Sequence, residues 1–308
     1  MTNSDDEIRD ILLSTRRIAV VGASDRPSRP SFGVAAFLRE RGYAVTPVNP
    51  GIAGLSLHGA TVAANLDVAA PLDMVDVFRR SSEAGAAVDE AIGSEARAII
   101  VGSASPKFFS AGADVKKFLD GDVDANMAMI RTSQAAFARM AAASQVFLAH
   151  LNGHALGGGL ELTLACDLRY ASEGSYKLGT PEVTLGLLPG NGGTQRLTRL
   201  VGPSRAMELL ITGRTFSPRE ALDMGLVAAL FPAEEAADRV REVAERLAAG
   251  PALAVAAIKR CVHEGGEASL QDGLALEGRL IEELFRSRDA TEGLTAFVEK
   301  RPPAFVGA

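Results

Sequence analysis

The first hundred residues alternate between short apolar runs and longer segments with one apolar face. The apolar runs predict strands over residues 17–22, 43–48, 72–78 and 98–101. The segments between them, at 32–41 and 81–93, predict helices. Strands that alternate with helices are typical of a parallel α/β sheet, so the sequence predicts such a sheet at the N-terminal end.

The pattern changes after residue 103. Residues 108–196 are rich in glycine, and the chain beyond residue 204 is almost wholly helical. The predicted helices, the longer of which are amphipathic, cover residues 204–212, 218–224, 234–248, 251–263, 270–286 and 291–300. No obvious flexible linker separates the two patterns, so we expect two halves that meet within continuous structure near residues 95–103.

Composition and charge narrow the classes of function. The 308 residues are enough for about two domains, and the net charge of −6 excludes a general attraction to nucleic acid or to an anionic membrane. Cys166 and Cys261 are too few for a disulfide framework, and the histidines form no HExxH pattern, so no metal site is predicted. There is no signal-peptide pattern and no apolar run of about 18 residues, which predicts a cytoplasmic protein without a membrane span.

A loop with the chemistry of a phosphate site follows the first predicted strand. That strand ends at Gly22, and the loop supplies the Ser24 hydroxyl and the Arg29 guanidinium ahead of a helix. Hydroxyls, cations and a helix N-terminus suit a polyphosphate. A nicotinamide dehydrogenase is disfavoured, because the GxGxxG pattern is absent and the second strand ends at Asn49-Pro50 without an acid for a ribose. An ordinary strand–helix turn with solvated arginines is the alternative.

Two glutamates in glycine-rich surroundings are the candidates for chemistry. Glu161 follows three consecutive glycines and is predicted in the first turn of a helix over about 159–166. Glu182 lies in Thr180-Pro-Glu182, ahead of a second glycine-rich stretch. Glycine lets backbone N–H groups approach a ligand oxygen, and paired carboxylates can hold one water between a base and an acid. The pattern predicts water addition or proton transfer beside a carbonyl group.

Two further positions, Asp114 and His154, have a structural interpretation. Asp114 is placed to cap a helix that begins at Val115, which would leave the Ala113 N–H exposed to a ligand oxygen. An ordinary capped helix start is the alternative. His154 is interpreted as a packing or hydrogen-bonding residue, because no nucleophile pattern such as GxSxG accompanies it.

Residues 5–97 resemble the small CoA-binding Rossmann-like domain. The matching segments are Ile18-Ala-Val-Val-Gly-Ala-Ser24, Arg29-Pro-Ser-Phe-Gly-Val34, Val45-Thr-Pro-Val-Asn-Pro50 and Met74-Val-Asp-Val-Phe-Arg-Arg80. The resemblance implies that Gly22, Ser24 and Arg29 lie near the phosphates of a CoA. The family domain continues through further sheet elements beyond residue 98, and this chain does not, so we expect a truncated domain.

From about Ala96 to the C-terminus, the chain is similar to the crotonase (enoyl-CoA hydratase/isomerase) superfamily. The landmarks are Phe109-Ser-Ala-Gly-Ala-Asp114, Asn152-Gly-His-Ala-Leu-Gly-Gly-Gly-Leu-Glu161, Pro181-Glu182, Leu188-Pro-Gly-Asn-Gly-Gly-Thr-Gln-Arg196 and Gly293-Leu-Thr-Ala-Phe-Val-Glu-Lys-Arg301. The resemblance implies an oxyanion hole formed by the N–H groups of Ala113 and Gly158. It implies that Glu161 and Glu182 are the catalytic carboxylates.

The same resemblance implies CoA contacts from Ala111, Asp114, Val115 and Lys300. A member that keeps both glutamates is expected to be an enoyl-CoA hydratase, with Glu161 activating the water and Glu182 donating the proton. No redox cofactor or metal is expected, since CoA enters as part of the acyl-CoA substrate. The resemblance also implies a homo-oligomer, a trimer or a hexamer. An enoyl-CoA isomerase of the same fold and a non-catalytic CoA-binding or regulatory protein are the alternatives.

The resemblances divide the chain into a Rossmann-like domain over 1–97 and a crotonase-like domain over 98–308. The second domain is expected to comprise a ββα-spiral core over about 98–200 and a helical region over about 201–308. The family's opening strand and its Arg-Pro…Asn-Ala-Leu segment are missing. A strand–helix–strand unit over residues 74–101 stands in their place, and we hypothesise that both domains share it.

Overall fold

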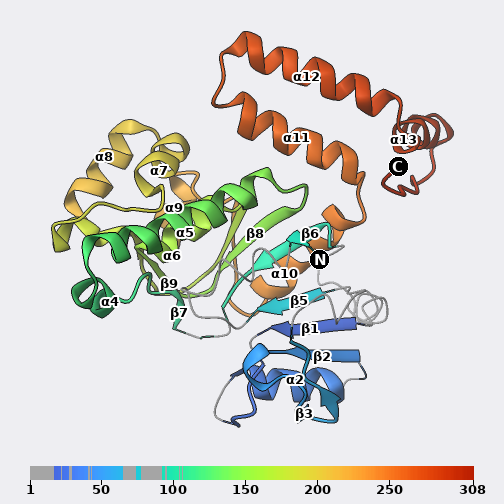
Figure 1. Cartoon of the computed structure of the whole chain (residues 1–308). Coiled ribbons are helices and arrows are strands. Elements are labelled where there is room, and N and C mark those ends of the chain that lie inside the picture. The colour runs from blue at the N-terminus through green and yellow to red at the C-terminus, as the bar shows by residue number, and fades with distance from the viewer. Residues whose placement is uncertain are drawn as a thin grey trace.

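The computed structural model of the chain describes residues 17–21, 23–27, 30–40, 42, 44–64, 74–77, 92–93, 96–103, 105 and 107–308. Of the predicted features, Gly22, Arg29 and most of the helix over 81–93 lie outside these residues. The described part contains three parallel sheets and one antiparallel hairpin (Figure 1).

A small parallel sheet lies at the N-terminal end, drawn in blue to cyan in Figure 1. Its central strand β1 (Arg17–Val21) pairs with β2 (Ala44–Val48) and with β5 (Met74–Val77), which confirms the three predicted strands. Helix α2 (Pro30–Glu40) connects β1 to β2 and packs on the sheet through buried apolar side chains. A hairpin of β3 (Ser56–Leu57) and β4 (Ala60–Thr61) follows β2.

Two further parallel sheets form the middle of the chain. The larger has the order β12-β10-β8-β6 and the smaller has the order β11-β9-β7. The larger sheet consists of β6 (Ala98–Val101), β8 (Val146–Leu151), β10 (Leu168–Ser172) and β12 (Ala229–Phe231). The smaller consists of β7 (Phe108–Ser110), β9 (His154–Leu156) and β11 (Leu178–Gly179). Each of β6, β8 and β10 is followed by a strand of the smaller sheet and then by helical structure, so the chain winds in repeated strand–strand–helix turns.

The helices of these turns cover the sheets. They are α4 (Val115–Asp120), α5 (Val123–Ala142), α6 (Gly158–Ala165), the 3₁₀ helix η4 (Pro181–Leu185) and α7 (Gly193–Val201). The 20-residue α5, which buries Phe137 and Met140 in the core, was not predicted from the sequence. A second core cluster gathers Leu151, Leu160 and Leu178 between the two sheets and the following helices.

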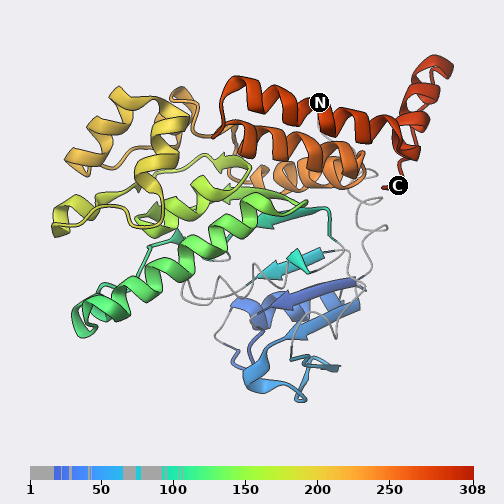
Figure 2. The same ribbon diagram turned by 45° about the horizontal axis from the view of Figure 1, so that its top comes forward.

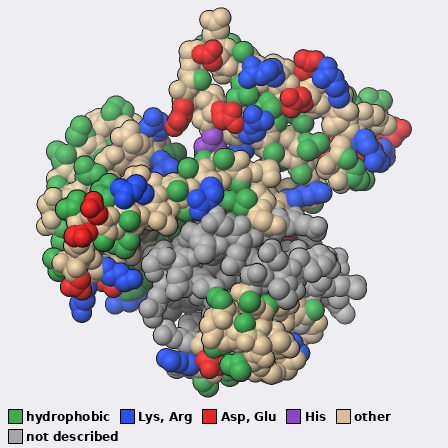
Figure 3. Space-filling model, in the orientation of Figure 1, with side chains coloured by type: hydrophobic (Ala, Val, Ile, Leu, Met, Phe, Trp, Pro, Cys, Tyr) green, Lys and Arg blue, Asp and Glu red, His purple; other side chains and the backbone are tan. Residues whose placement is uncertain are grey.

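The C-terminal third is helical, as predicted, apart from β12. Its helices are α8 (Pro203–Thr212), α9 (Pro218–Asp223), α10 (Ala236–Ala248), α11 (Ala252–Gly265), α12 (Leu270–Phe285) and α13 (Arg288–Glu299). Figures 1 and 2 show α11, α12 and α13 extending away from the sheets. Large apolar side chains are exposed on them, and Figure 3 shows these mixed with charged groups. No helix in the described part of the chain is long and apolar enough to cross a bilayer.

A buried ion pair fastens α11 to the core. The Nζ of Lys259 is 2.9 Å from Oδ2 of Asp167, and it also donates to the carbonyl groups of Met140 and Gln145, at 2.7 Å each. Oδ1 of Asp167 lies 2.9 Å from Nε2 of His263 on the same helix. Because these partners satisfy the buried charges, the site holds α11 in a fixed position against the end of α5.

The strand–helix–strand unit at the junction is divided between two sheets. β5 pairs with β1 of the small sheet, and β6 pairs with β8 of the larger one. Among the pairings described, none joins β5 to β6. The domain boundary at residues 97 and 98 stays a prediction, as does the sharing of this unit by two domains.

Candidate active site

Glu161 lies in the first turn of α6, as predicted, and its side chain is buried, with 1% of the residue exposed. One oxygen, Oε1, accepts hydrogen bonds from the N–H groups of Asn191 at 2.7 Å and Gly193 at 2.8 Å. Burial raises the pKa of Glu161, while these backbone donors and the nearby Arg196 charge oppose that rise. The surroundings therefore hold the carboxyl group in one orientation, and its pKa lies above the ordinary value because burial outweighs the donors.

Glu182 lies in the first turn of η4, and its surroundings are different. Its Oε2 is buried and has no hydrogen-bond partner among the described residues. Burial, with a smaller contribution from the negative charge of Glu161, raises the pKa of Glu182 to about 7. The two carboxylates are thus near enough to interact, and burial favours the protonated form of both.

Two of the three glycines before Glu161, Gly157 and Gly159, each have a separate structural reason. Gly157 has φ +54°, and a Cβ there would lie 2.9 Å from Oε1 of Glu182. A Cβ on Gly159 would overlap the Ser110 carbonyl oxygen of β7. Glycine is therefore required both for the turn and for the approach of α6 to the neighbouring loop.

The two predicted oxyanion donors lie side by side. A Cβ built on Gly158 would be 3.9 Å from the Ala113 nitrogen, so the two loops approach each other closely here. Gly112 makes this approach possible, because its φ is +84° and a Cβ there would lie 2.7 Å from the Leu156 carbonyl oxygen. Within the described residues, the N–H groups of Ala113 and Gly158 donate to no protein acceptor. They are available for a ligand oxygen next to the two glutamates.

The predicted CoA-contacting residues are distributed over three places. Ala111, Asp114 and Val115 are exposed on the same loop as Ala113, at the start of α4. The Asp114 side chain accepts the Lys116 N–H at 3.1 Å, which confirms the predicted helix cap.

The other two described candidates lie elsewhere. Lys300 is exposed at the C-terminal end of α13, and Figures 1 and 2 show α13 and α4 at opposite sides of the molecule. Ser24 follows β1 of the small sheet, where its hydroxyl accepts the Arg26 N–H at 3.2 Å. Within one chain the structure does not bring either residue to the glutamates.

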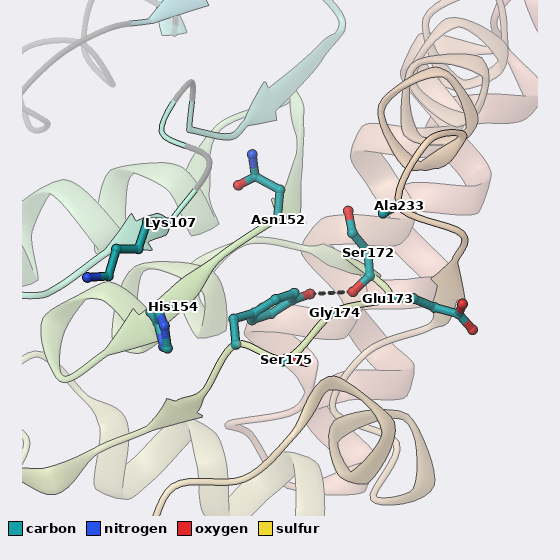
Figure 4. A pocket seen from close by; sticks show the side chains of 9 residues that line it. Lys107, Asn152, His154, Ser172, Glu173, Gly174, Ser175 and Ala233 are labelled. Carbon is teal, nitrogen blue, oxygen red and sulfur yellow. Dashed lines mark hydrogen bonds between the residues drawn. The ribbon is translucent and has the colours of Figure 1, made fainter.

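His154 has the packing and hydrogen-bonding role that the sequence predicts. Its Nδ1 accepts the Lys177 N–H at 3.0 Å, and its ring lies 5.2 Å from the ring of Phe108. It lines a cavity of about 520 Å³, shown in Figure 4 with Lys107, Asn152 and Ser172. Neither glutamate lines this cavity, so it is separate from the carboxylate pair. Among the described residues, no group of three or more His, Cys, Asp or Glu side chains could hold a metal ion.

The residues that hold Glu161 in place were not predicted from the sequence. Asn191 and Gly193 belong to the second glycine-rich stretch, which the sequence marks only as a loop before a helix. A Cβ on Gly193 would lie 3.0 Å from Oε1 of Glu161 and would crowd its carboxylate. The run of glycines was the available signal, but its target, 30 residues away, depends on the tertiary fold.

The site places N–H donors bordered by glycine beside a carboxylate pair, on repeated strand–strand–helix turns. This arrangement is typical of a class of enzyme that stabilises an oxyanion next to acid–base groups. The model of the enoyl-CoA hydratase/isomerase family matches residues 79–308. The chain belongs to the enoyl-CoA hydratase/isomerase family, the crotonase superfamily.

Individual relatives agree with this assignment. The chain is 41% identical over 207 residues to a probable enoyl-CoA hydratase of Mycobacterium tuberculosis, covering 67% of this chain and 79% of that protein. It is 38% identical over 209 residues to the 2,3-dehydroadipyl-CoA hydratase of Escherichia coli, covering 68% and 80%. A crystal structure of an enoyl-CoA hydratase from Geobacillus kaustophilus superposes with a TM-score of 0.69 at 44% identity, covering 74% of this chain and 85% of that one.

Proposed function

We propose that this protein is an enoyl-CoA hydratase, which adds water reversibly to a trans-2-enoyl-CoA to give a 3-hydroxyacyl-CoA. The observation that carries the proposal is the difference between the two carboxylates. Glu161 accepts two backbone N–H bonds, which favour its ionised form, whereas Oε2 of Glu182 is buried with no donor among the described residues. Two neighbouring carboxyl groups with different tendencies to hold a proton suit a base and an acid.

The proposed reaction uses both groups in one addition. Ionised Glu161 takes a proton from the water, whose oxygen forms a bond to the β-carbon of the enoyl group. The electrons of the double bond move toward the thioester carbonyl, giving an enolate, and protonated Glu182 supplies the proton that the α-carbon gains. Proton transfer from Glu161 back to Glu182 restores the starting state, so no redox cofactor and no metal is required.

The N–H groups of Ala113 and Gly158 supply the other part of the proposal. Their bonds to the thioester oxygen strengthen as it becomes enolate-like, so they stabilise the transition state more than the bound substrate. Removal of one such donor typically costs about 3 kcal/mol of transition-state stabilisation. Exposed Ala111, Asp114 and Val115 border these donors and are proposed to contact the CoA.

The rest of the chain is proposed to extend CoA binding and to assemble copies of the protein. The small parallel sheet is proposed to be a truncated Rossmann-like CoA-binding domain, with Ser24 near a phosphate. We also propose a homo-oligomer, a trimer or a hexamer, that covers apolar side chains exposed on the C-terminal helices, such as Val262 and Phe297. Since Lys300 lies far from Asp114 within one chain, it would contact CoA only at the site of another copy.

The direct test follows the absorbance of a 2-enoyl thioester in the presence of the purified protein. We expect the absorbance to fall with wild-type protein and to persist with Glu161→Gln and Glu182→Gln, whose folding is checked by circular dichroism. Titration calorimetry that shows CoA binding without any loss of absorbance would instead identify a non-catalytic CoA-binding protein.

An enoyl-CoA isomerase is the second candidate, favoured by one observation. Burial raises the pKa of Glu182 to about 7, so this side chain alone could take a proton from one carbon and return it to another near neutral pH. Supplying a 3-enoyl thioester separates the two activities. An isomerase converts it to the 2-enoyl thioester without needing Glu161, whereas the proposed hydratase requires both glutamates.

A further inference from the structure

The loop that binds Glu161 is itself held by side chains of two helices. The Nε2 of Gln134, on α5, donates to the carbonyl oxygen of Gly190 at 2.7 Å. Nη1 of Arg196, on α7, donates to the carbonyl oxygen of Asn191 at 2.8 Å. These carbonyl groups lie in the segment whose Asn191 and Gly193 N–H groups bind Oε1 of Glu161. Any movement of this segment would therefore move the donors of the glutamate.

The position of the Arg196 guanidinium is fixed from several sides. It lies 5.7 Å from the centre of the Phe137 ring, which contacts it across the α5–α7 interface. A Cβ on Gly192 would overlap Nη1 of Arg196, so the arginine occupies the space that a side chain at position 192 would need. The φ of Gly192, +98°, also favours glycine. The guanidinium therefore has little freedom to leave the Asn191 carbonyl.

Charge connects Arg196 to Glu161 as well. The positive charge of Arg196 lowers the pKa of Glu161 and opposes the effect of burial. The other charged groups that act on Arg196 are Glu267, of the turn between α11 and α12, and Arg199, one turn along α7. Among the described residues, Arg196 is the cation whose charge acts on Glu161.

We propose that Arg196 is a positioning residue for the hydration reaction. By holding the Asn191 carbonyl it fixes the segment whose N–H groups bind Glu161, and so it keeps that carboxyl group oriented to take a proton from water. Arg196 acts through Glu161 and need not touch the substrate. This inference rests on the proposed hydratase function.

The test compares Arg196→Met with Arg199→Met, which removes a cation from the same helix face without removing the bond to Asn191. In Arg196→Met we expect the acid limb of the pH–kcat profile to move up by about one pH unit, the size of effect that a nearby opposite charge has on a carboxyl. On that limb kcat should fall about tenfold, with little change in KM. Arg199→Met should leave the limb in place. An unmoved limb in Arg196→Met would overturn the proposal.

A second readout does not depend on catalysis. The carboxyl carbon of Glu161 can be titrated by ¹³C NMR in protein with labelled glutamate, with Glu161→Gln identifying the signal. We expect a higher pKa for Glu161 in Arg196→Met than in wild type, and equal values would contradict the positioning role. If Arg196→Met fails to fold, Arg196→Gln, which removes the charge and keeps a polar side chain, takes its place in both experiments.

The two claims can fail separately. If the wild-type protein hydrates no 2-enoyl thioester, the proposed function fails, and the NMR titration still decides whether Arg196 sets the ionisation of Glu161. If hydration occurs and neither the limb nor the NMR pKa responds to Arg196, the positioning role is wrong and the hydratase assignment stands.

Discussion

Replacing Glu182 by glutamine should stabilise the folded protein at alkaline pH while it abolishes hydration. The reason is the cost of an ionised carboxylate whose Oε2 is buried and has no partner in the described part of the chain. The rise in pKa from 4.5 to about 7 corresponds to about 3 kcal/mol, at about 1.4 kcal/mol per pH unit. Because the side chain is partly accessible to water, we expect about 1–2 kcal/mol to be measured.

The sign of the effect follows from proton binding. Between pH 4.5 and about 7, folded Glu182 keeps a proton that the unfolded chain releases. Its contribution to stability is therefore full below about pH 4.5 and is lost as the pH rises through about 7. Glutamine at position 182 cannot ionise, so the variant does not lose this stability as the pH rises.

The assay is urea unfolding of wild type and Glu182→Gln at pH 5 and at pH 8.5, at one protein concentration. We expect the two free energies of unfolding to be similar at the lower pH and the variant to be more stable at the higher pH. Glu208→Gln, which changes an exposed carboxylate, serves as the control for a general loss of negative charge. Equal differences between wild type and Glu182→Gln at both pH values would refute the reasoning.

Three further outcomes are expected. Turnover should fall as the pH rises through about 7, because Glu182 must be protonated to donate, and a pH–kcat profile that is flat between pH 6 and 8.5 would contradict this. Gly159→Ala should lower turnover by about 100-fold or prevent folding, because its Cβ would overlap the Ser110 carbonyl oxygen and displace α6; steady-state kinetics together with circular dichroism test this. Lys259→Met should cost about 3–5 kcal/mol of stability by leaving the partly buried Asp167 without its lysine partner, and urea unfolding with an unchanged midpoint would contradict that.

Much of the secondary structure could be predicted because its apolar pattern is strong and local. The strands β1, β2 and β6 and the helices α10 to α13 match their predicted ranges within a few residues. β12 was missed inside the helical third, since a three-residue strand is defined by its pairing with β10 and not by its own sequence. α5 was not predicted, because the stretch that contains it was characterised by its glycine motifs.

The candidate site could likewise be predicted only in part. Both glutamates and both N–H donors could be located, because glycine runs and family motifs mark them in the sequence. The asymmetry between the carboxylates could not, because it depends on which loop approaches each of them in three dimensions. Lys300 shows the same limit, since only the fold places it on helices that extend away from the loop bearing Asp114.

The source of the oxygen in the product tests the central proposal most directly. A 2-enoyl thioester is incubated with the protein in H₂¹⁸O, and the acyl product is analysed by mass spectrometry after a short reaction. We predict one ¹⁸O atom in the hydroxyl group at the β-carbon with wild-type protein, and none with Glu161→Gln. A product that has rearranged its double bond and carries no ¹⁸O would contradict the account.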